Sequence, residues 1–208
     1  MGRYIGASCR RCRAVGEKLF LKTKKCTTAK CMLERRNFRP GQHGKGRRKI
    51  SEYSLQLTEK QKLRNMYGMS EKQFRSYFEE SARQKGVTGH NLLIMLERRL
   101  DNVVMRTGLC GSRNQARQFI RHGHIKVNEH RVDIPSFLVK KDDVITVAAK
   151  DKSKKMVDAI MELTAGRVVP EWLKVDKEKK TAEVSIIPAV EDIDHKINVQ
   201  LIVELYSK

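Results

Sequence analysis

The sequence predicts an α+β protein in which a cysteine-containing segment and a basic arm precede several helices and a small antiparallel sheet. Three observations support this fold class. Four of the five cysteines lie within residues 9–31. From residue 58 onwards, polar capping residues precede apolar residues that recur at helical spacing. After residue 123, short runs alternate between apolar and polar residues, as strands do.

The four clustered cysteines have the spacing C-x2-C-x13-C-x4-C. They are Cys9, Cys12, Cys26 and Cys31. Each short pair lets two thiolates reach one ion, and the intervening residues bring the two pairs together in a tetrahedral site. Four sulfur ligands leave no open position for water, so we expect a closed structural site that holds one zinc ion. An iron–sulfur cluster and four unrelated thiols are the alternatives.

The surroundings of the cysteines favour metal binding over disulfides. The chain shows no secretory signal, which indicates a reducing compartment. Nearby cations would offset the negative charge of a zinc tetrathiolate and favour deprotonated thiols. These cations are Arg10, Arg11, Arg13, Lys24, Lys25 and Lys30. The fifth cysteine, Cys110, has no partner in the sequence and is expected to be a small buried hydrophobe.

Residues 32–50 form a basic arm. They combine seven Lys or Arg with Pro40, Gly41, Gly44 and Gly46, a composition that is typical of loops. One interpretation is a solvated basic tail. The other is an arm that lies along phosphates and becomes ordered only when it binds them.

The remaining elements follow in order along the chain. Capping boxes at residues 58–61 and 70–73 are each expected to begin a helix. A third helix is expected from Gly89 to a point before Gly108, and a fourth between Ser112 and Gly123. Strands are expected at 124–127, 132–135 and 144–148. A further helix is expected at 153–163, and a hairpin at 172–175 with 181–187. By pattern alone, the tail 197–208 is compatible with a strand or a helix.

The fourth helix carries a basic stripe and an opposing apolar face. Arg113, Arg117 and Arg121 recur at i, i+4 and i+8. The apolar face consists of Ala116, Phe119 and Ile120. Three guanidiniums on an exposed face can meet several phosphates, whereas a merely solvated face is the alternative. We therefore expect Arg117→Glu to weaken RNA binding with little effect on folding.

The overall charge supports a polyanionic partner. The 208 residues carry a formal net charge of +20, and 33% of them are charged. Residues 1–50 contain 16 Lys or Arg and 2 acids, whereas the other 158 residues contain 28 and 22. Nucleic acid, an anionic membrane and an acidic protein would each fit this excess. No apolar run approaches the roughly 20 residues that span a bilayer, and no myristoylation pattern is present, so nucleic acid is favoured and no membrane partner is expected.

Three stretches resemble one known family. Residues 112–128, SRNQARQFIRHGHIKVN, resemble the RNA-binding module named after small-subunit ribosomal protein S-four. Residues 97–104, ERRLDNVV, resemble the start of that module, and residues 39–44, RPGQHG, resemble the N-terminal loop of the family. With the basic start and the terminal LIVELYSK, the resemblance to the bacterial proteins covers essentially the whole chain, and some members keep a four-cysteine knuckle. The sequence departs from the module at Glu129, where glycine is common.

The resemblance implies a helical domain split in sequence, with an S-four-type module of helices and a small antiparallel sheet inserted. The implied domains are a metal knuckle and basic extension at 1–45, a helical domain at 46–96 completed by 188–208, and an RNA-binding domain at 97–187. The tail would then be a short helix that packs on residues 58–96.

The resemblance also implies a function. Such proteins are cytoplasmic, structural constituents of the small ribosomal subunit, which bind its RNA early in assembly at a multi-helix junction in the body and support decoding accuracy. Implied partners are the small-subunit ribosomal RNA, messenger RNA near the channel through which it enters, and neighbouring ribosomal proteins three and notably five. Some bacterial members repress their own messenger. No small-molecule substrate is expected.

The candidate RNA-binding residues combine the basic start and arm with the helix and the strand and turn that follow it. They are Arg3, Arg10, Arg11, Arg13, Arg35, Arg36, Arg39, Gln42, His43, Lys45, Arg47, Arg48, Arg113, Arg117, Arg121, His122, Lys126 and Asn128.

Two other functions fit the sequence less well. Residues 99–101, Arg-Leu-Asp, match part of the catalytic motif of pseudouridine synthases, but Thr107 and Gly108 come too late after Asp101 and the chain is too short for the catalytic domain. Asp101 is instead expected to lie on a helix and support Arg98 or its neighbours. The sequence has no phosphate-binding Gly-rich loop and no nucleophile elbow, so we expect no enzyme. A free, stress-related RNA-binding factor would be shorter and lack the split helical domain.

Overall fold

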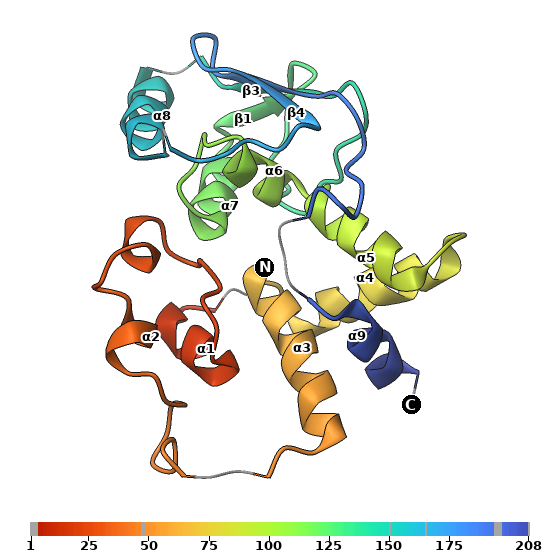
Figure 1. The fold of residues 1–208 in the computed structure, drawn as a ribbon. Helices are drawn as coiled ribbons and strands as arrows, with labels where there is room; N and C mark the ends of the chain where they lie inside the picture. Colours follow the sequence, from red (N-terminus) through yellow and green to blue (C-terminus); the bar gives the residue numbers. More distant parts are fainter. Residues whose placement is uncertain (1–3, 47–48, 150, 165, 194–196, 208) are drawn as a thin grey trace. The chain divides into compact units, whose positions relative to one another are not determined.

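The chain folds into two compact units (Figure 1). The computed structural model describes residues 4–46, 49–149, 151–164, 166–193 and 197–207. Unit 1 comprises Met1–Leu92 and His195–Lys208, and unit 2 comprises Leu93–Asp194. The predicted segments 1–45 and 46–96 thus lie largely in one unit, and their division into separate domains stays a prediction.

Unit 1 is helical. Its elements are α1 (Ser8–Val15), the 3-10 turn η1 (Lys24–Cys26), α2 (Met32–Arg35), α3 (Glu52–Met66), α4 (Glu71–Arg83), the start of α5 (Thr88–Glu97) and α9 (Val199–Tyr206). The last helix, α9, packs against α3 (Figure 1). Gln56 Nε2 donates a hydrogen bond to Glu204 Oε2 over 3.2 Å, and the Tyr206 ring stacks on Phe78 with 4.5 Å between centroids. The tail helix that the resemblance implied is therefore confirmed.

The first long helix begins earlier than the sequence predicted. Ser51 precedes α3, and its hydroxyl accepts a hydrogen bond from the Ser54 backbone N–H over 3.2 Å. Thr58 lies inside the helix, where its Oγ1 donates to the Ser54 carbonyl. The predicted start at Thr58 is wrong because Ser51 supplies a cap two turns earlier. The caps predicted at Ser70 and Ser112 are confirmed.

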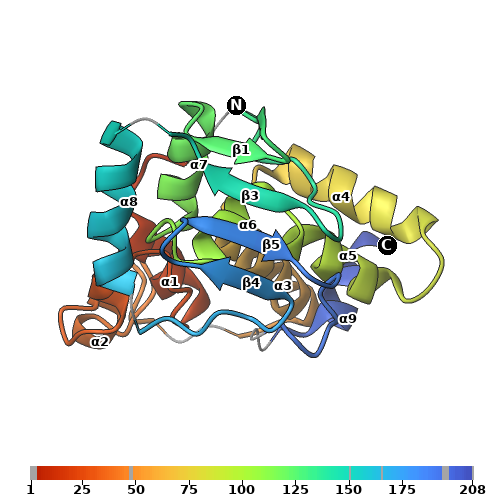
Figure 2. The same cartoon turned by 90° about the horizontal axis from the view of Figure 1, so that it is seen from above.

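Unit 2 packs helices against a five-stranded antiparallel sheet (Figure 2). Its helices are α6 (Leu100–Arg106), α7 (Arg113–Arg121) and α8 (Asp151–Thr164). Its strands are β1 (Ile125–Val127), β2 (His130–Arg131), β3 (Val144–Val147), β4 (Leu173–Asp176) and β5 (Thr181–Val184), in the order β2-β1-β3-β5-β4. Buried residues of α6, α7 and the sheet share one core. They include Val103, Val104, Phe119, Ile120, Ile145 and Val184.

The predicted helix from Gly89 towards Gly108 is divided in two. Between α5 and α6, Arg99 has extended backbone angles (φ −65°, ψ 134°) and forms an antiparallel bridge with Leu138. The Leu100 backbone N–H donates to the Phe137 carbonyl over 2.8 Å. The helix is interrupted because this segment pairs with residues far along the chain, which local periodicity does not reveal.

The strand predicted at 132–135 is also misplaced, because β2 follows directly after a two-residue turn. Asn128 and Glu129 both have positive φ, 48° and 65°, as a type I′ hairpin turn requires. The Asn128 Oδ1 accepts from the Val144 N–H over 2.9 Å, and its Nδ2 donates to Asp143 Oδ1 over 2.8 Å. These bonds fix the turn against β3, although Glu129 replaces the glycine that is common there.

Candidate RNA-binding surfaces and the cysteine cluster

The arginine stripe on α7 is less exposed than the sequence predicted. The opposing apolar face is confirmed, since Ala116, Phe119 and Ile120 are buried. However, the Arg117 side chain is only 11% exposed, and its Nε donates to Asp101 Oδ2 over 2.6 Å. Arg121 is exposed. The expectation that Arg117 lies on an exposed face is therefore wrong, because a buried carboxylate of α6 binds it.

Two residues at the start of α6 hold arginines of the stripe on α7 by hydrogen bonds. Asp101, on α6, is buried and also binds the buried Arg99, whose Nε and Nη2 lie 3.1 and 3.0 Å from its two oxygens. The next residue, Asn102, accepts a hydrogen bond from Arg113 Nε over 2.9 Å. Consecutive residues of α6 thus hold two arginines that lie one turn apart on α7. Asp101 supports neighbours as expected, but not Arg98, which donates to the Val139 carbonyl.

The junction after α7 adds exposed basic side chains. His122 and Lys126 are exposed, and Gly123 has φ of +70°, which lets the chain reverse as predicted. Arg131 lies directly opposite Lys126 in the β1–β2 pair, and its guanidinium lies against Gly123, where a Cβ would overlap it. Arg131 is not among the residues predicted from the sequence. A two-residue turn at Asn128 and Glu129 would have predicted its position, because such a turn fixes which residues of β1 and β2 lie opposite each other.

The four cysteines come together in unit 1. Cys12, Cys26 and Cys31 are buried, Cys9 is half-buried, and none is in a disulfide. Burial raises the pKa of the Cys12 thiol, the backbone N–H of Leu19 lowers it, and the three other cysteines raise it further. The pKa of Cys26 is raised by the same kind of causes. Ionisation of one of these thiols therefore affects the pKa of its neighbours in the cluster.

The cysteine side chains of this cluster do not have the geometry of a metal site. Within the part of the chain that the structure describes, no three His, Cys, Asp or Glu side chains are placed so as to hold a metal ion. The predicted zinc site therefore stays a prediction. Of the cations expected around it, Arg10, Lys25 and Lys30 are exposed, and the side chain of Lys24 lies outside the described residues. Arg11 lies over the Tyr4 ring, 3.9 Å from its centroid.

An ion pair between buried Lys62 and exposed Glu17 attaches the cysteine segment to α3. The Nζ atom of Lys62, whose side chain is 6% exposed, lies 2.7 Å from Glu17 Oε2 and 3.8 Å from Glu59 Oε1. Glu17 is the single acidic residue among residues 9–31. Burying an ammonium requires such partners, so this contact fixes where the segment docks.

The basic arm has a defined shape. The structure describes a folded loop at residues 37–46, held by Arg13 of α1, which donates hydrogen bonds to the carbonyls of Phe38 and Arg39. The predicted ordering of the arm on RNA stays a prediction. Among the predicted RNA contacts of the arm, Arg35, Arg36, Gln42, His43 and Lys45 are exposed, and Arg39 is half-buried. The predicted contacts Arg3, Arg47 and Arg48 lie outside the described residues.

Basic side chains thus lie together at the junction after α7 and on the loop at 37–46. Such clusters are typical of the class of RNA-binding proteins. None of the described helices combines the length and apolar character needed to cross a membrane. Comparison with known proteins narrows the class. Residues 3–97 match the family described as ribosomal protein S4/S9 N-terminal domain, and residues 98–145 match the S4 domain.

Full-length relatives identify the family. The chain is 57% identical over 208 residues to small ribosomal subunit protein uS4 of Acetivibrio thermocellus, and 55% and 53% identical to the proteins of that name from Ruminiclostridium cellulolyticum and Pelotomaculum thermopropionicum. Each alignment covers 100% of both chains. The chain belongs to the uS4 family of small ribosomal subunit proteins. This membership confirms the resemblance to the bacterial ribosomal family and the prediction that the protein is not an enzyme.

Proposed function

We propose that the chain is a cytoplasmic, structural component of the small ribosomal subunit, where it binds small-subunit ribosomal RNA early in assembly of the subunit body and supports accurate decoding. The observation that carries this proposal is the 57% identity, over the full length of both chains, to a protein named for that subunit. The physical features of the described surfaces support it in three ways.

First, the stripe on α7 is preorganised. Asp101 and Asn102 bind the Nε atoms of Arg117 and Arg113, so the planes of both guanidiniums are fixed before RNA arrives. An arginine that is already held loses less side-chain entropy when it meets a phosphate. The surface is therefore suited to a partner of fixed shape.

Second, cations lie side by side at the edge of the sheet. Lys126 and Arg131 are directly opposite each other in the antiparallel pair, an arrangement in which like charges repel. A bound phosphate would relieve that repulsion. Exposed His122 and Arg121, at the end of α7, extend the same basic junction.

Third, the composition favours folded RNA over unpaired single strands. Aromatic residues make up 6% of the chain, too few for a platform on which successive bases stack. Arginine and lysine instead suit a helical junction that is recognised through phosphates and 2′-hydroxyls. Messenger RNA near the channel through which it enters and the neighbouring ribosomal protein five are further proposed partners.

We also propose that the cysteine cluster binds one zinc ion. The donor set supports this, because Cys12, Cys26 and Cys31 are buried, Cys9 is half-buried, and their charges interact. Backbone N–H groups of Leu19 and Lys22 hydrogen-bond to the sulfurs of Cys12 and Cys26 and would stabilise thiolates. When bound, zinc would supply a closed cross-link within the segment. Elemental analysis of freshly purified protein, with an absorption spectrum to detect iron, tests the metal.

The proposed function is tested by RNA binding and by sedimentation. Purified protein should bind small-subunit ribosomal RNA in preference to large-subunit RNA, and the logarithm of its affinity should fall linearly with the logarithm of salt concentration. In cell extracts it should remain with small subunits after a high-salt wash. Equal affinity for both RNAs, or protein found only in the free fraction, would show that the proposal is wrong.

A further inference from the structure

Arg13 connects the cysteine segment to the basic loop. Its Nε donates to the Phe38 carbonyl over 2.9 Å, and its Nη2 donates to the Arg39 carbonyl over 3.3 Å. Its guanidinium also lies over the Phe38 ring, with Cζ 4.8 Å from the centroid. Three contacts from one side chain thus fix the start of the loop, and the forked guanidinium can make both hydrogen bonds while it lies over the ring.

The rest of the loop closes around the same phenylalanine. The Lys45 Nζ lies 5.3 Å from the centroid of Phe38. Between them, the Gly44 backbone N–H donates to the Gly41 carbonyl over 3.3 Å. A Cβ on residue 44 would overlap the Arg39 carbonyl oxygen, the same atom that accepts from Arg13. The loop is therefore tight, and glycine is required at its closing point.

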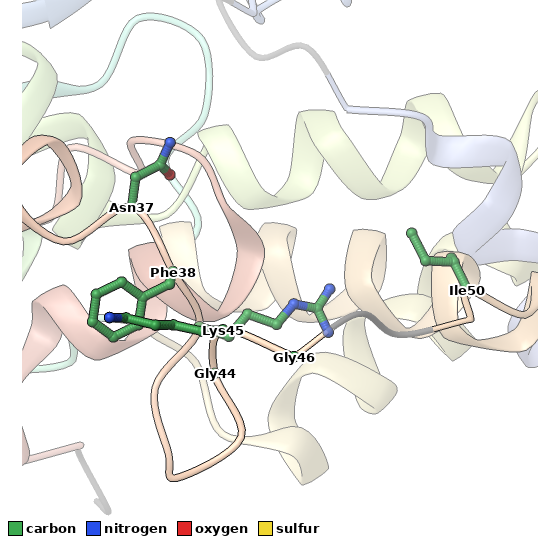
Figure 3. A pocket seen from close by; sticks show the side chains of 7 residues that line it. Asn37, Phe38, Gly44, Lys45, Gly46 and Ile50 are labelled. Atoms are coloured by element: carbon green, nitrogen blue, oxygen red, sulfur yellow. The ribbon is translucent and has the colours of Figure 1, made fainter.

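This loop borders an open, basic cavity of about 560 Å³. The cavity is lined by Asn37, Phe38, Arg39, Gly44, Lys45, Gly46 and Ile50. Figure 3 shows the Lys45 side chain extending across the Phe38 ring, with Asn37 and Ile50 at the two ends. No lining residue is acidic, and two are cationic, so the cavity suits a phosphodiester backbone.

We infer that Arg13 is a positioning residue that keeps the loop at 37–46 folded, so that Arg39 and Lys45 bind backbone phosphates of RNA at this cavity. The inference rests on the proposed function and deepens it. It replaces the sequence-based expectation that Arg13 itself contacts RNA. The two roles differ in what lysine can do at position 13, because lysine keeps the charge but cannot form both carbonyl bonds while stacking on Phe38.

The test compares Arg13→Lys and Arg13→Ala with the same changes at Arg10, which is exposed on the same helix. Affinity for small-subunit ribosomal RNA is measured as a function of salt, and circular dichroism confirms folding. We expect Arg13→Lys to lose nearly as much affinity as Arg13→Ala, about tenfold. The slope of the logarithm of affinity against the logarithm of salt concentration should also become shallower, by the amount that corresponds to about two phosphate contacts. Each Arg10 variant should lower it by at most about one. Recovery of wild-type affinity by lysine would overturn the inference.

A second experiment avoids a change of charge at position 13. Gly44→Ala should reproduce the loss of affinity and the shallower salt dependence, because it disrupts the loop without removing a cation.

A third experiment tests whether Arg13 acts through Arg39 and Lys45. If it does, Arg13→Ala should cost little further affinity in a protein that already carries Arg39→Ala and Lys45→Ala. Additive losses would show that Arg13 binds RNA directly. Failure of the wild-type protein to bind the RNA would instead overturn the proposed function.

Discussion

Arg117 and Asp101 form an ion pair that links α7 to the first turn of α6, with 2.6 Å between Nε and Oδ2. Asp101 is 1% exposed, and the Arg117 side chain is 11% exposed. Arg99, which is completely buried, completes the group. A residue that the sequence presents as a surface cation is therefore also part of the internal structure of unit 2.

We predict that Arg117→Glu destabilises the protein as well as weakening RNA binding. The change places a second carboxylate against buried Asp101, and breaking a buried pair costs about 3–5 kcal/mol. Chemical denaturation monitored by circular dichroism measures the loss. Arg121→Glu is the matched control, because Arg121 is exposed on the same helix and should lose RNA affinity with little change in stability. Equal stability of the two variants would show that the pair contributes nothing.

The stability of unit 1 should depend on pH through Glu71. Burial raises the pKa of Glu71, but the hydrogen bond and charge of Lys60, the hydrogen bond from Tyr206 and the charge of Arg64 outweigh it, so the pKa is lowered. The contribution to stability is therefore present above the unfolded-state pKa of about 4.3 and is lost as pH falls through the lower, folded-state pKa.

The experiment compares Glu71→Gln with the wild type by urea denaturation between pH 7 and pH 3. Glu71→Gln should be less stable at pH 7, and the difference should shrink below about pH 4, where the wild-type carboxyl becomes protonated. Glu79→Gln is the control, since Glu79 lies on the same helix in an exposed pair with Arg75. A difference that does not change with pH would exclude the ionised carboxylate as its cause.

Removal of the proposed zinc ion should unfold the cysteine segment and leave the rest of the chain folded. Structural zinc contributes about 10 kcal/mol or more to such segments. We expect a chelator to release one zinc per chain and to lower RNA affinity, while circular dichroism retains the helical signal of residues 58–208. Cys110→Ser should retain the metal. RNA affinity that is unchanged by chelation would show that the cluster serves folding alone.

The thiol of Cys110 should react slowly. Burial raises its pKa to about 12, although the charge of Arg167 acts in the opposite direction. Very little thiolate therefore exists at pH 8, and access is blocked as well. Mass spectrometry after iodoacetamide treatment should find Cys110 unmodified in the native protein and fully modified in guanidinium chloride. Rapid modification of the native protein would contradict the burial of this residue.

Local features could be predicted from the sequence because their causes lie within a few residues. Ser70 and Ser112 each cap the helix that follows them, and Gly123 ends α7 with a positive φ. The apolar face of α7 also follows from its own spacing. The alternation at 144–148 and the hairpin near 172–187 were located for the same reason.

The errors have causes that lie far apart in sequence. Arg117 is held by a carboxylate 16 residues away. The break at Arg99 depends on pairing with Leu138. Side-chain spacing on one helix cannot reveal such partners. The RNA contacts and the zinc ion stay predictions, since they concern molecules outside the chain.

The discontinuity of unit 1 sets the order in which the protein can fold during its own synthesis. α3 and α4 leave the ribosome early, but α9, which packs on α3, is made only after the whole of unit 2. At about 5–20 residues per second, that interval lasts on the order of ten seconds. Unit 2 can therefore complete its core first, before α3 has its partner helix α9. α9 follows unit 2 along the chain and completes the helical unit whose first helices precede unit 2, so a chain terminated before α9 would keep the RNA-binding module of unit 2 but lack a finished helical unit.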